Sequence, residues 1–190
     1  ADERCDFISG GARRDFFFSF CAATLLDKPH VSLFKDGTLI WSDAGGQNGQ
    51  QMQAQALAGQ TALHVADLVT EASSYIRAWL PGLHRLGASI HRTLAIVDRN
   101  QNGRAILAAE GVGLSSLITI DASLFKQAAD TGLISSEQLQ QILAFTHDPD
   151  RYMTTFLAGH PGYLEAQIAL GGSSRERALR CLELGYGQRR

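Results

Sequence analysis

Hydroxyl side chains follow a single carboxylate where an apolar stretch ends near the middle of the chain. Residues 61–66 are mainly apolar and lead to Asp67, and Thr70, Ser73 and Ser74 come soon after it. A carboxylate accepts hydrogen bonds from sugar hydroxyls, while hydroxyls and backbone amides at a helix start bind phosphate. The pattern therefore predicts a sugar-phosphate site. The segment alone leaves open a hydroxyl helix cap beside an incidental aspartate.

A second candidate anion site lies near the beginning of the chain. An apolar stretch ends in the run Ser9-Gly10-Gly11-Ala12-Arg13-Arg14, which also opens a predicted helix. Glycines allow backbone N–H groups to turn toward an anion, and a helix start favours negative charge. Arginines there oppose the usual preference for acidic residues in a first turn. We interpret the run as an anion loop; a tight turn with solvated arginines is the alternative.

The elements expected to position these residues alternate between strands and helices. This alternation predicts an α/β fold with a central, mostly parallel sheet and helices on both faces. The expected strands cover residues 6–9, 30–35, 61–66, 90–97 and 114–120, and the expected helices cover residues 13–26, 73–86 and 103–110. Residues 36–60 are rich in Gly and Gln, which leaves two possibilities: a mobile functional loop, or a hairpin with a short helix.

From residue 121 onward the pattern is helical. Ser135-x-x-Gln138 and Ser173-x-x-Glu176 match the capping box, Asp148-Pro149 matches a helix start, and Gly185 matches a helix stop. We expect residues 1–131 to form the α/β core and residues 132–190 to form a helical extension packed on it. The alternative for the helical part is a small separate subdomain.

Composition narrows the classes of partner. Of 190 residues, 45% are hydrophobic and 19% charged, and the net charge of −2 provides no basic field for nucleic acid or anionic lipid. No apolar stretch approaches the roughly 20 residues that cross a bilayer. The three cysteines are an odd number without metal-site spacing, and the charged start differs from a signal peptide. We expect a cytoplasmic protein that binds neither nucleic acid nor membrane.

Residues 61–74 resemble the phosphoribosyl pyrophosphate motif of type I phosphoribosyltransferases. That motif is an apolar strand, two acids, two apolar residues, Thr-Thr-Gly and a closing hydroxyl. Asp67 matches the second acid, Thr70 the first threonine and Ser74 the closing hydroxyl. The sequence departs from the motif where Ala66, Glu71 and Ala72 replace the first acid, the second threonine and the glycine.

Other segments resemble the same family in the same order, over roughly residues 5–131. Residues 8–11 resemble its pyrophosphate loop, and Lys35 matches a strand-end lysine that meets pyrophosphate. The run Val97-Asp98-Arg99 resembles orotate phosphoribosyltransferases, in which the arginine engages the pyrimidine. The sequence begins almost at the pyrophosphate-loop strand and does not include the family's N-terminal hood. Either the hood is missing or the sequence is a fragment of a longer protein. Residues 36–60 lack the Lys-x-His-Gly of the family's mobile loop.

The resemblance implies pentosyl transfer from phosphoribosyl pyrophosphate to a pyrimidine base, in nucleotide biosynthesis or salvage, by a homodimer. Mg²⁺ would be the cofactor, held indirectly by Asp67 through the donor. Asp67 and Lys35 are the expected catalytic residues. The expected substrate-binding residues are Ser9, Gly10, Gly11, Ala12, Arg13, Arg14, Thr70, Glu71, Ala72, Ser73, Ser74 and Arg99. The alternative is a weakened or inactive regulatory module that binds nucleotide or phosphate on the same fold.

Overall fold

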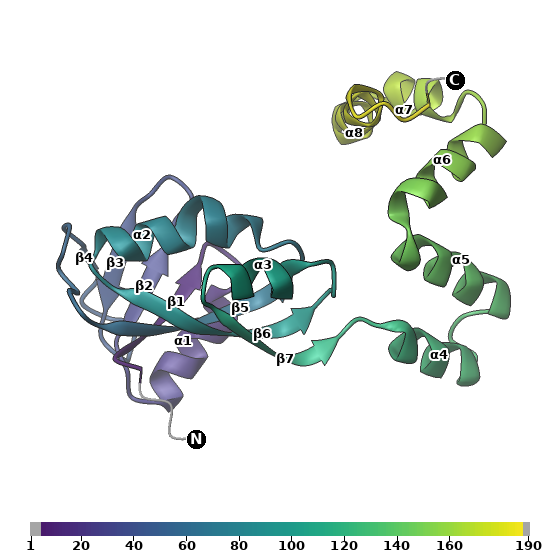
Figure 1. The fold of residues 1–190 in the computed structure, drawn as a ribbon. Coiled ribbons are helices and arrows are strands. Elements are labelled where there is room, and N and C mark those ends of the chain that lie inside the picture. Colours follow the sequence, from purple (N-terminus) through teal and green to yellow (C-terminus); the bar gives the residue numbers. More distant parts are fainter. Residues whose placement is uncertain (1–4, 188–190) are drawn as a thin grey trace. The chain divides into compact units, whose positions relative to one another are not determined.

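The computed structural model describes residues 5–187, which divide into two compact units (Figure 1). The first unit ends at Asp121 and the second begins at Ala122. This division falls earlier than the boundary at residue 131 expected from the sequence, since a helix at Ala122–Asp130 belongs to the second unit. That the helices pack on the α/β core stays a prediction.

The first unit contains a seven-stranded sheet in the order β4-β3-β2-β1-β5-β6-β7 among the described residues. Strands β2, β1, β5, β6 and β7 pair in parallel, while β3 and β4, at one edge, pair antiparallel. This arrangement confirms the predicted mostly parallel sheet. The bounds are β1 Phe7–Gly11, β2 His30–Leu33, β3 Leu39–Ser42, β4 Gln50–Gln51, β5 Thr61–Val69, β6 Ser89–Asp98 and β7 Gly113–Thr119.

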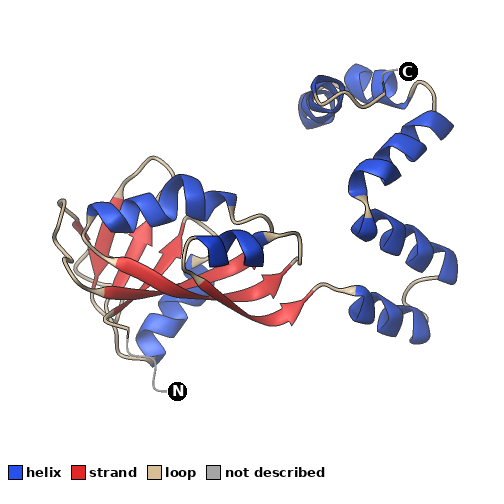
Figure 2. Cartoon of the chain, in the orientation of Figure 1, coloured by secondary structure: helices blue, strands red, loops and turns tan. Residues whose placement is uncertain are grey.

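Helices cover both faces of this sheet, as predicted (Figures 1 and 2). Helix α1 (Phe16–Leu25) lies on one face, whereas α2 (Leu80–Arg85) and α3 (Gly103–Ala109) lie on the other. The helix expected over residues 73–86 forms, with one change: part of it is a π-helical turn, η1 (Tyr75–Trp79), that continues into α2. Pro81 explains the change, because it has no amide hydrogen to donate to the carbonyl of the residue four positions earlier.

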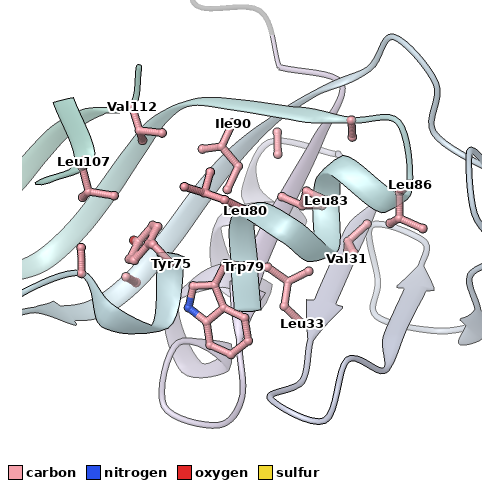
Figure 3. Close-up of a cluster of buried hydrophobic side chains, with 14 of the residues drawn as sticks. Val31, Leu33, Tyr75, Trp79, Leu80, Leu83, Leu86, Ile90, Leu107 and Val112 are labelled. Atoms are coloured by element: carbon pink, nitrogen blue, oxygen red, sulfur yellow. The ribbon is translucent and has the colours of Figure 1, made fainter. Parts of the chain in front are cut away.

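Strands β1 and β2 are buried along their whole length, and residues on the two faces of the sheet supply two cores. The larger core lies between the sheet and the η1–α2 segment, where Trp79, Leu80 and Leu83 meet Val31 and Leu33 of β2 (Figure 3). The smaller core lies on the α1 side and contains Ile8, Ala23 and Val65. Both cores contain residues of β1 and β5. The predicted site segments lie at the ends of these two strands.

Residues 36–60 form a hairpin, one of the two possibilities that the sequence left open. Strand β3 pairs antiparallel with β2 and β4, and no helix forms between residues 36 and 60. Leu57 is buried in the larger core, which fastens the segment to the sheet. The short helix of that alternative is therefore absent from this stretch.

The second unit is helical, as the sequence predicted, with a small core of Leu157, Leu164 and Ala178. Its helices are α4 Ala122–Asp130, α5 Ser136–His147, α6 Pro149–Gly159, α7 Tyr163–Leu170 and α8 Gly172–Glu183. None of the helices in residues 5–187 is both long enough and apolar enough to cross a membrane.

Three of the four predicted helix signals in this unit are confirmed. Ser135 and Gln138 form the capping box, the Asp148 carboxylate accepts the Arg151 amide before Pro149, and Gly185 follows α8 at a φ of 87°. The prediction of a capping box at Ser173 is wrong. Helix α8 already begins at Gly172, so Ser173 lies inside the helix and cannot cap it.

Candidate functional site

A cavity of about 750 Å³ opens at the carboxyl ends of three neighbouring parallel strands. In open α/β sheets this edge is the usual place for a ligand. Because β1 lies between β2 and β5 in the sheet, the segments that follow these strands meet. The lining comprises residues 11–15, Phe34, Lys35, residues 66–75 and Trp79.

Most of the predicted site residues line this one cavity. Gly11, Ala12, Arg13 and Arg14 come from the end of β1, and Lys35 follows β2. The segment after β5 contributes Asp67, Thr70, Glu71, Ala72, Ser73 and Ser74. The structure therefore brings together eleven of the fourteen residues expected from the sequence, and their roles stay predictions.

Ser9 and Gly10 lie behind the cavity and are not part of its lining. Both belong to β1, and the buried Ser9 hydroxyl lies 2.9 Å from Nδ1 of His64. A Cβ on Gly10 would lie 2.2 Å from Oγ of Ser19 in α1. The glycine at position 10 thus allows α1 to pack closely on β1, and only Gly11 reaches the cavity.

Arg99 lies next to the cavity without lining it, and its side chain is exposed. Its backbone N–H donates to the Val69 carbonyl at 2.9 Å, and the Gly103 N–H donates to the Thr70 carbonyl at 3.0 Å. These two bonds fasten the turn after β6 to the segment after β5. The predicted contact of Arg99 with a base stays a proposal.

The loop after β5 has a backbone that favours glycine at one position. Ala72 has a φ of 51°, in the left-handed region, which costs an L-residue roughly 1 kcal/mol. This is the residue at which the resembling motif has glycine. Ser74 precedes η1 but its side chain makes no capping hydrogen bond, so the alternative of a simple hydroxyl cap does not hold for Ser74.

Charges of both signs face the cavity. Arg13, Arg14 and Lys35 balance Asp15, Asp67 and Glu71 in the lining. Burial, followed by the neighbouring Asp15 carboxylate, raises the pKa of Asp67, while Arg14 acts in the opposite direction. A bound polyanion would therefore meet three cations and Asp15 on the β1 and β2 side, and Asp67 and Glu71 on the β5 side.

Replacing Glu71 by glutamine is expected to tighten the binding of a phosphorylated ligand about two- to fivefold. Glu71 lines the cavity and is exposed, so its repulsion is partly screened and is worth about 0.5–1 kcal/mol. Calorimetric titration with phosphoribosyl pyrophosphate measures the change. The control is Glu110→Gln, which makes the same charge change at an exposed residue outside the lining and should leave affinity as it was. Equal or weaker binding by Glu71→Gln would contradict a phosphate beside Glu71.

Sequence reasoning missed several residues of the site, above all Asp15. Its Oδ2 accepts the Gly11 N–H and its Oδ1 accepts the Asp67 N–H, both at 2.9 Å. Tyr75 and Trp79 form the apolar wall and project from η1 (Figure 3). No signal in the sequence marks these aromatics as a cavity wall, and none along the chain joins Asp15 to Asp67.

Known proteins that resemble this chain in sequence or in fold include phosphoribosyltransferases. No family model matches the chain. A curated orotate phosphoribosyltransferase of Halobacterium salinarum is 36% identical over 61 residues, which is 32% of this chain and 34% of that protein. The chain thus matches about a third of the length of this curated relative.

The solved structures agree on the fold. UMP synthase of Leishmania donovani has a TM-score of 0.57 at 16% identity, covering 76% of this chain and 29% of that one. Orotate phosphoribosyltransferase of Francisella tularensis has a TM-score of 0.56 at 13% identity, covering 77% and 71%. Adenine phosphoribosyltransferase of Thermoanaerobacter pseudethanolicus has a TM-score of 0.50 at 24% identity, covering 62% and 72%. With the sheet order and helix placement above, these likenesses identify the chain as having the type I phosphoribosyltransferase fold.

Proposed function

We propose that the chain transfers the phosphoribosyl group of phosphoribosyl pyrophosphate to a pyrimidine base, with orotate as the expected acceptor. The proposal rests on one observation: a single cavity is lined by both the Gly11–Arg14 loop and the Asp67–Ser74 segment. The first loop suits a pyrophosphate and the second suits a ribose 5-phosphate. The curated relative named orotate phosphoribosyltransferase supports the choice of acceptor.

The proposed donor lies with its charged ends at opposite sides of the cavity. The Gly11 and Ala12 region, with Arg13 and Lys35, faces the pyrophosphate, while Asp67 accepts hydrogen bonds from the ribose hydroxyls. The hydroxyls of Thr70, Ser73 and Ser74 hold the 5′-phosphate. Arg99, at the neighbouring rim, pairs with the carboxylate of the base.

The residues that line the cavity are compatible with Mg²⁺ that binds together with the donor. Among the described residues, no group of three His, Cys, Asp or Glu side chains could hold a metal ion by itself. Mg²⁺ typically keeps several waters and binds one or two carboxylates together with substrate phosphates. Asp67 is the carboxylate on the ribose side, and bound Mg²⁺ would supply charge neutralisation of the pyrophosphate.

The proposed reaction needs positioning and charge stabilisation but no nucleophilic side chain. A ring nitrogen of the base attacks C1′ of the ribose as the bond from C1′ to the pyrophosphate oxygen breaks. Positive charge develops on the ribose and negative charge on the leaving group. Asp67 faces the positive charge on the ribose, and the cations Arg13 and Lys35 face the negative charge on the leaving group.

The direct test is consumption of orotate in the presence of phosphoribosyl pyrophosphate and Mg²⁺, with release of pyrophosphate measured in parallel. Consumption of orotate together with release of pyrophosphate supports the proposal. Turnover with hypoxanthine or adenine but not orotate would keep the transferase activity and overturn the pyrimidine acceptor.

Glu71 and Ala66 favour a second candidate function, a regulatory module that binds a nucleotide or phosphate without turnover. Glu71 lines the cavity where a phosphate would lie, and Ala66 provides no carboxylate there. Such a module would give a stabilising thermal shift with nucleotides while leaving orotate unconsumed.

For the transferase we further propose a homodimer in the cytoplasm.

Replacing Asp67 by asparagine is expected to weaken donor binding about tenfold, within the 1–3 kcal/mol range of a charge-assisted hydrogen bond. The change removes the charge that the ribose hydroxyls and the donor-bound cation would meet. Calorimetric titration with phosphoribosyl pyrophosphate and Mg²⁺ gives the dissociation constant. Asp43→Asn, in the hairpin and outside the cavity lining, serves as control. Unchanged affinity in Asp67→Asn would remove Asp67 from the donor site.

A further inference from the structure

Asp15 connects two strand ends in a way that its position at a helix start does not require. It precedes α1, yet its side chain makes no capping hydrogen bond to that helix. Its two oxygens accept backbone amides from Gly11 at the end of β1 and from Asp67 in β5. A residue at this position usually caps its own helix. Here the carboxylate spans two strands that carry the two halves of the candidate site.

A buried histidine lies beneath this carboxylate. His64 of β5 is fully buried, and its Nε2 lies 3.7 Å from Oδ2 of Asp15, an ion-pair distance. Within residues 5–187 this Nε2 has no hydrogen-bond partner. Because an N–H facing a carboxylate is favoured over a lone pair facing it, we assign the hydrogen to Nε2. With this assignment Nδ1, 2.9 Å from the Ser9 hydroxyl, accepts its hydrogen bond.

Aromatic rings pack against the histidine of this pair. The His64 ring packs edge-on against Tyr75 at 4.9 Å and lies 6.5 Å from the Trp79 ring. Burial would raise the pKa of Asp15, but His64 and the Asp67 amide outweigh it and hold this pKa below its usual value. Asp15 therefore remains a charged acceptor for both amides.

The two amides determine how the site residues face the cavity. Fixing the Asp67 peptide fixes the direction in which its side chain leaves β5, and fixing the Gly11 peptide fixes the start of the pyrophosphate loop. We propose that Asp15, backed by His64, is the positioning residue that holds the pyrophosphate loop and Asp67 in register for the donor. This inference rests on the proposed function, because it presumes that phosphoribosyl pyrophosphate binds in the cavity.

The test compares Asp15 with a matched carboxylate at the other end of the same strands. Asp6 accepts the Thr61 N–H at 2.7 Å, so it also joins β1 to β5, but at their amino ends and outside the cavity lining. Dissociation constants for phosphoribosyl pyrophosphate with Mg²⁺ are measured by calorimetry for wild type, Asp15→Ala, Asp15→Asn and Asp6→Ala. Folding of each variant is checked by urea unfolding, and Asp15→Asn, close in shape to aspartate, keeps one amide acceptor.

We expect Asp15→Ala to weaken donor binding at least tenfold, Asp15→Asn to lie between it and wild type, and Asp6→Ala to stay within twofold of wild type. Binding by Asp15→Asn equal to wild type, or equal weakening in Asp15→Ala and Asp6→Ala, would overturn the positioning role. Failure of the wild-type protein to bind the donor would instead overturn the proposed function, and this inference with it.

Discussion

Replacing Gly11 by alanine is expected to lower the free energy of unfolding by about 3 kcal/mol, the upper part of the range for overpacking a core. A Cβ at this position would lie 2.3 Å from Cζ2 of Trp79 and 2.8 Å from Oδ2 of Asp15. Trp79 is almost fully buried and cannot move aside without disturbing the larger core. The same methyl group would push Asp15 off the Gly11 amide, so donor binding should be lost as well.

The control for Gly11 is Gly113→Ala at the start of β7. A Cβ there would meet the His91 carbonyl oxygen at 3.7 Å, an ordinary contact. Urea unfolding followed by tryptophan fluorescence reports on the first unit, since both tryptophans, Trp41 and Trp79, lie in it. A loss in Gly11→Ala no larger than in Gly113→Ala would show that the contact between Gly11, Trp79 and Asp15 is looser than described.

Acidification is expected to remove about 3 kcal/mol of stability through His30 alone. Burial, with a smaller contribution from His64, lowers the pKa of His30 from 6.5 to about 4. His30 is enclosed by Ser19, whose Oγ lies 2.9 Å from Nε2, and by the Phe20 ring stacked at 4.0 Å. Between these two pKa values the unfolded chain takes up a proton that the folded chain does not. Stability therefore falls as the pH drops from about 6.5 toward 4, at 1.36 kcal/mol per unit, roughly 3 kcal/mol in all.

Urea unfolding at a series of pH values measures this slope. His30→Gln removes the titrating group while keeping a polar side chain for Ser19, so its stability should change less over the same pH window. His91→Gln, at an exposed position in β6, is the control and should retain the wild-type slope. If His30→Gln keeps the wild-type slope too, another group is responsible for the acid sensitivity.

The mostly parallel sheet and the residues that line the cavity could be predicted in large part from local patterns. Apolar stretches that end in Gly11 and near Asp67, with helical patterns between them, are sufficient to predict parallel strands whose carboxyl ends meet. The predicted end of β5 was less accurate. The strand continues to Val69 because Leu68 and Val69 pair with Val97 and Asp98 of β6, and such pairing between distant segments leaves no mark on the local sequence.

The residues that support the site were harder to predict, because their roles depend on contacts across the fold. Asp15 lies 52 positions before Asp67, whose amide its carboxylate accepts, and Ser9 lies 55 positions before the His64 ring. Gly10 and Gly11 look equivalent in sequence. The alternation of a strand points one toward α1 and the other toward Trp79, so only one of them reaches the cavity.

In the proposed function, the ends of β1, β2 and β5 form a single site for both charged ends of one phosphorylated sugar. Calorimetric titration of the wild-type chain in Mg²⁺ with phosphoribosyl pyrophosphate, ribose 5-phosphate and pyrophosphate tests whether the site is shared. One molecule of phosphoribosyl pyrophosphate per chain should bind at least tenfold more tightly than either fragment, and each fragment should compete with it. Affinity for phosphoribosyl pyrophosphate no greater than for pyrophosphate alone would contradict a shared site.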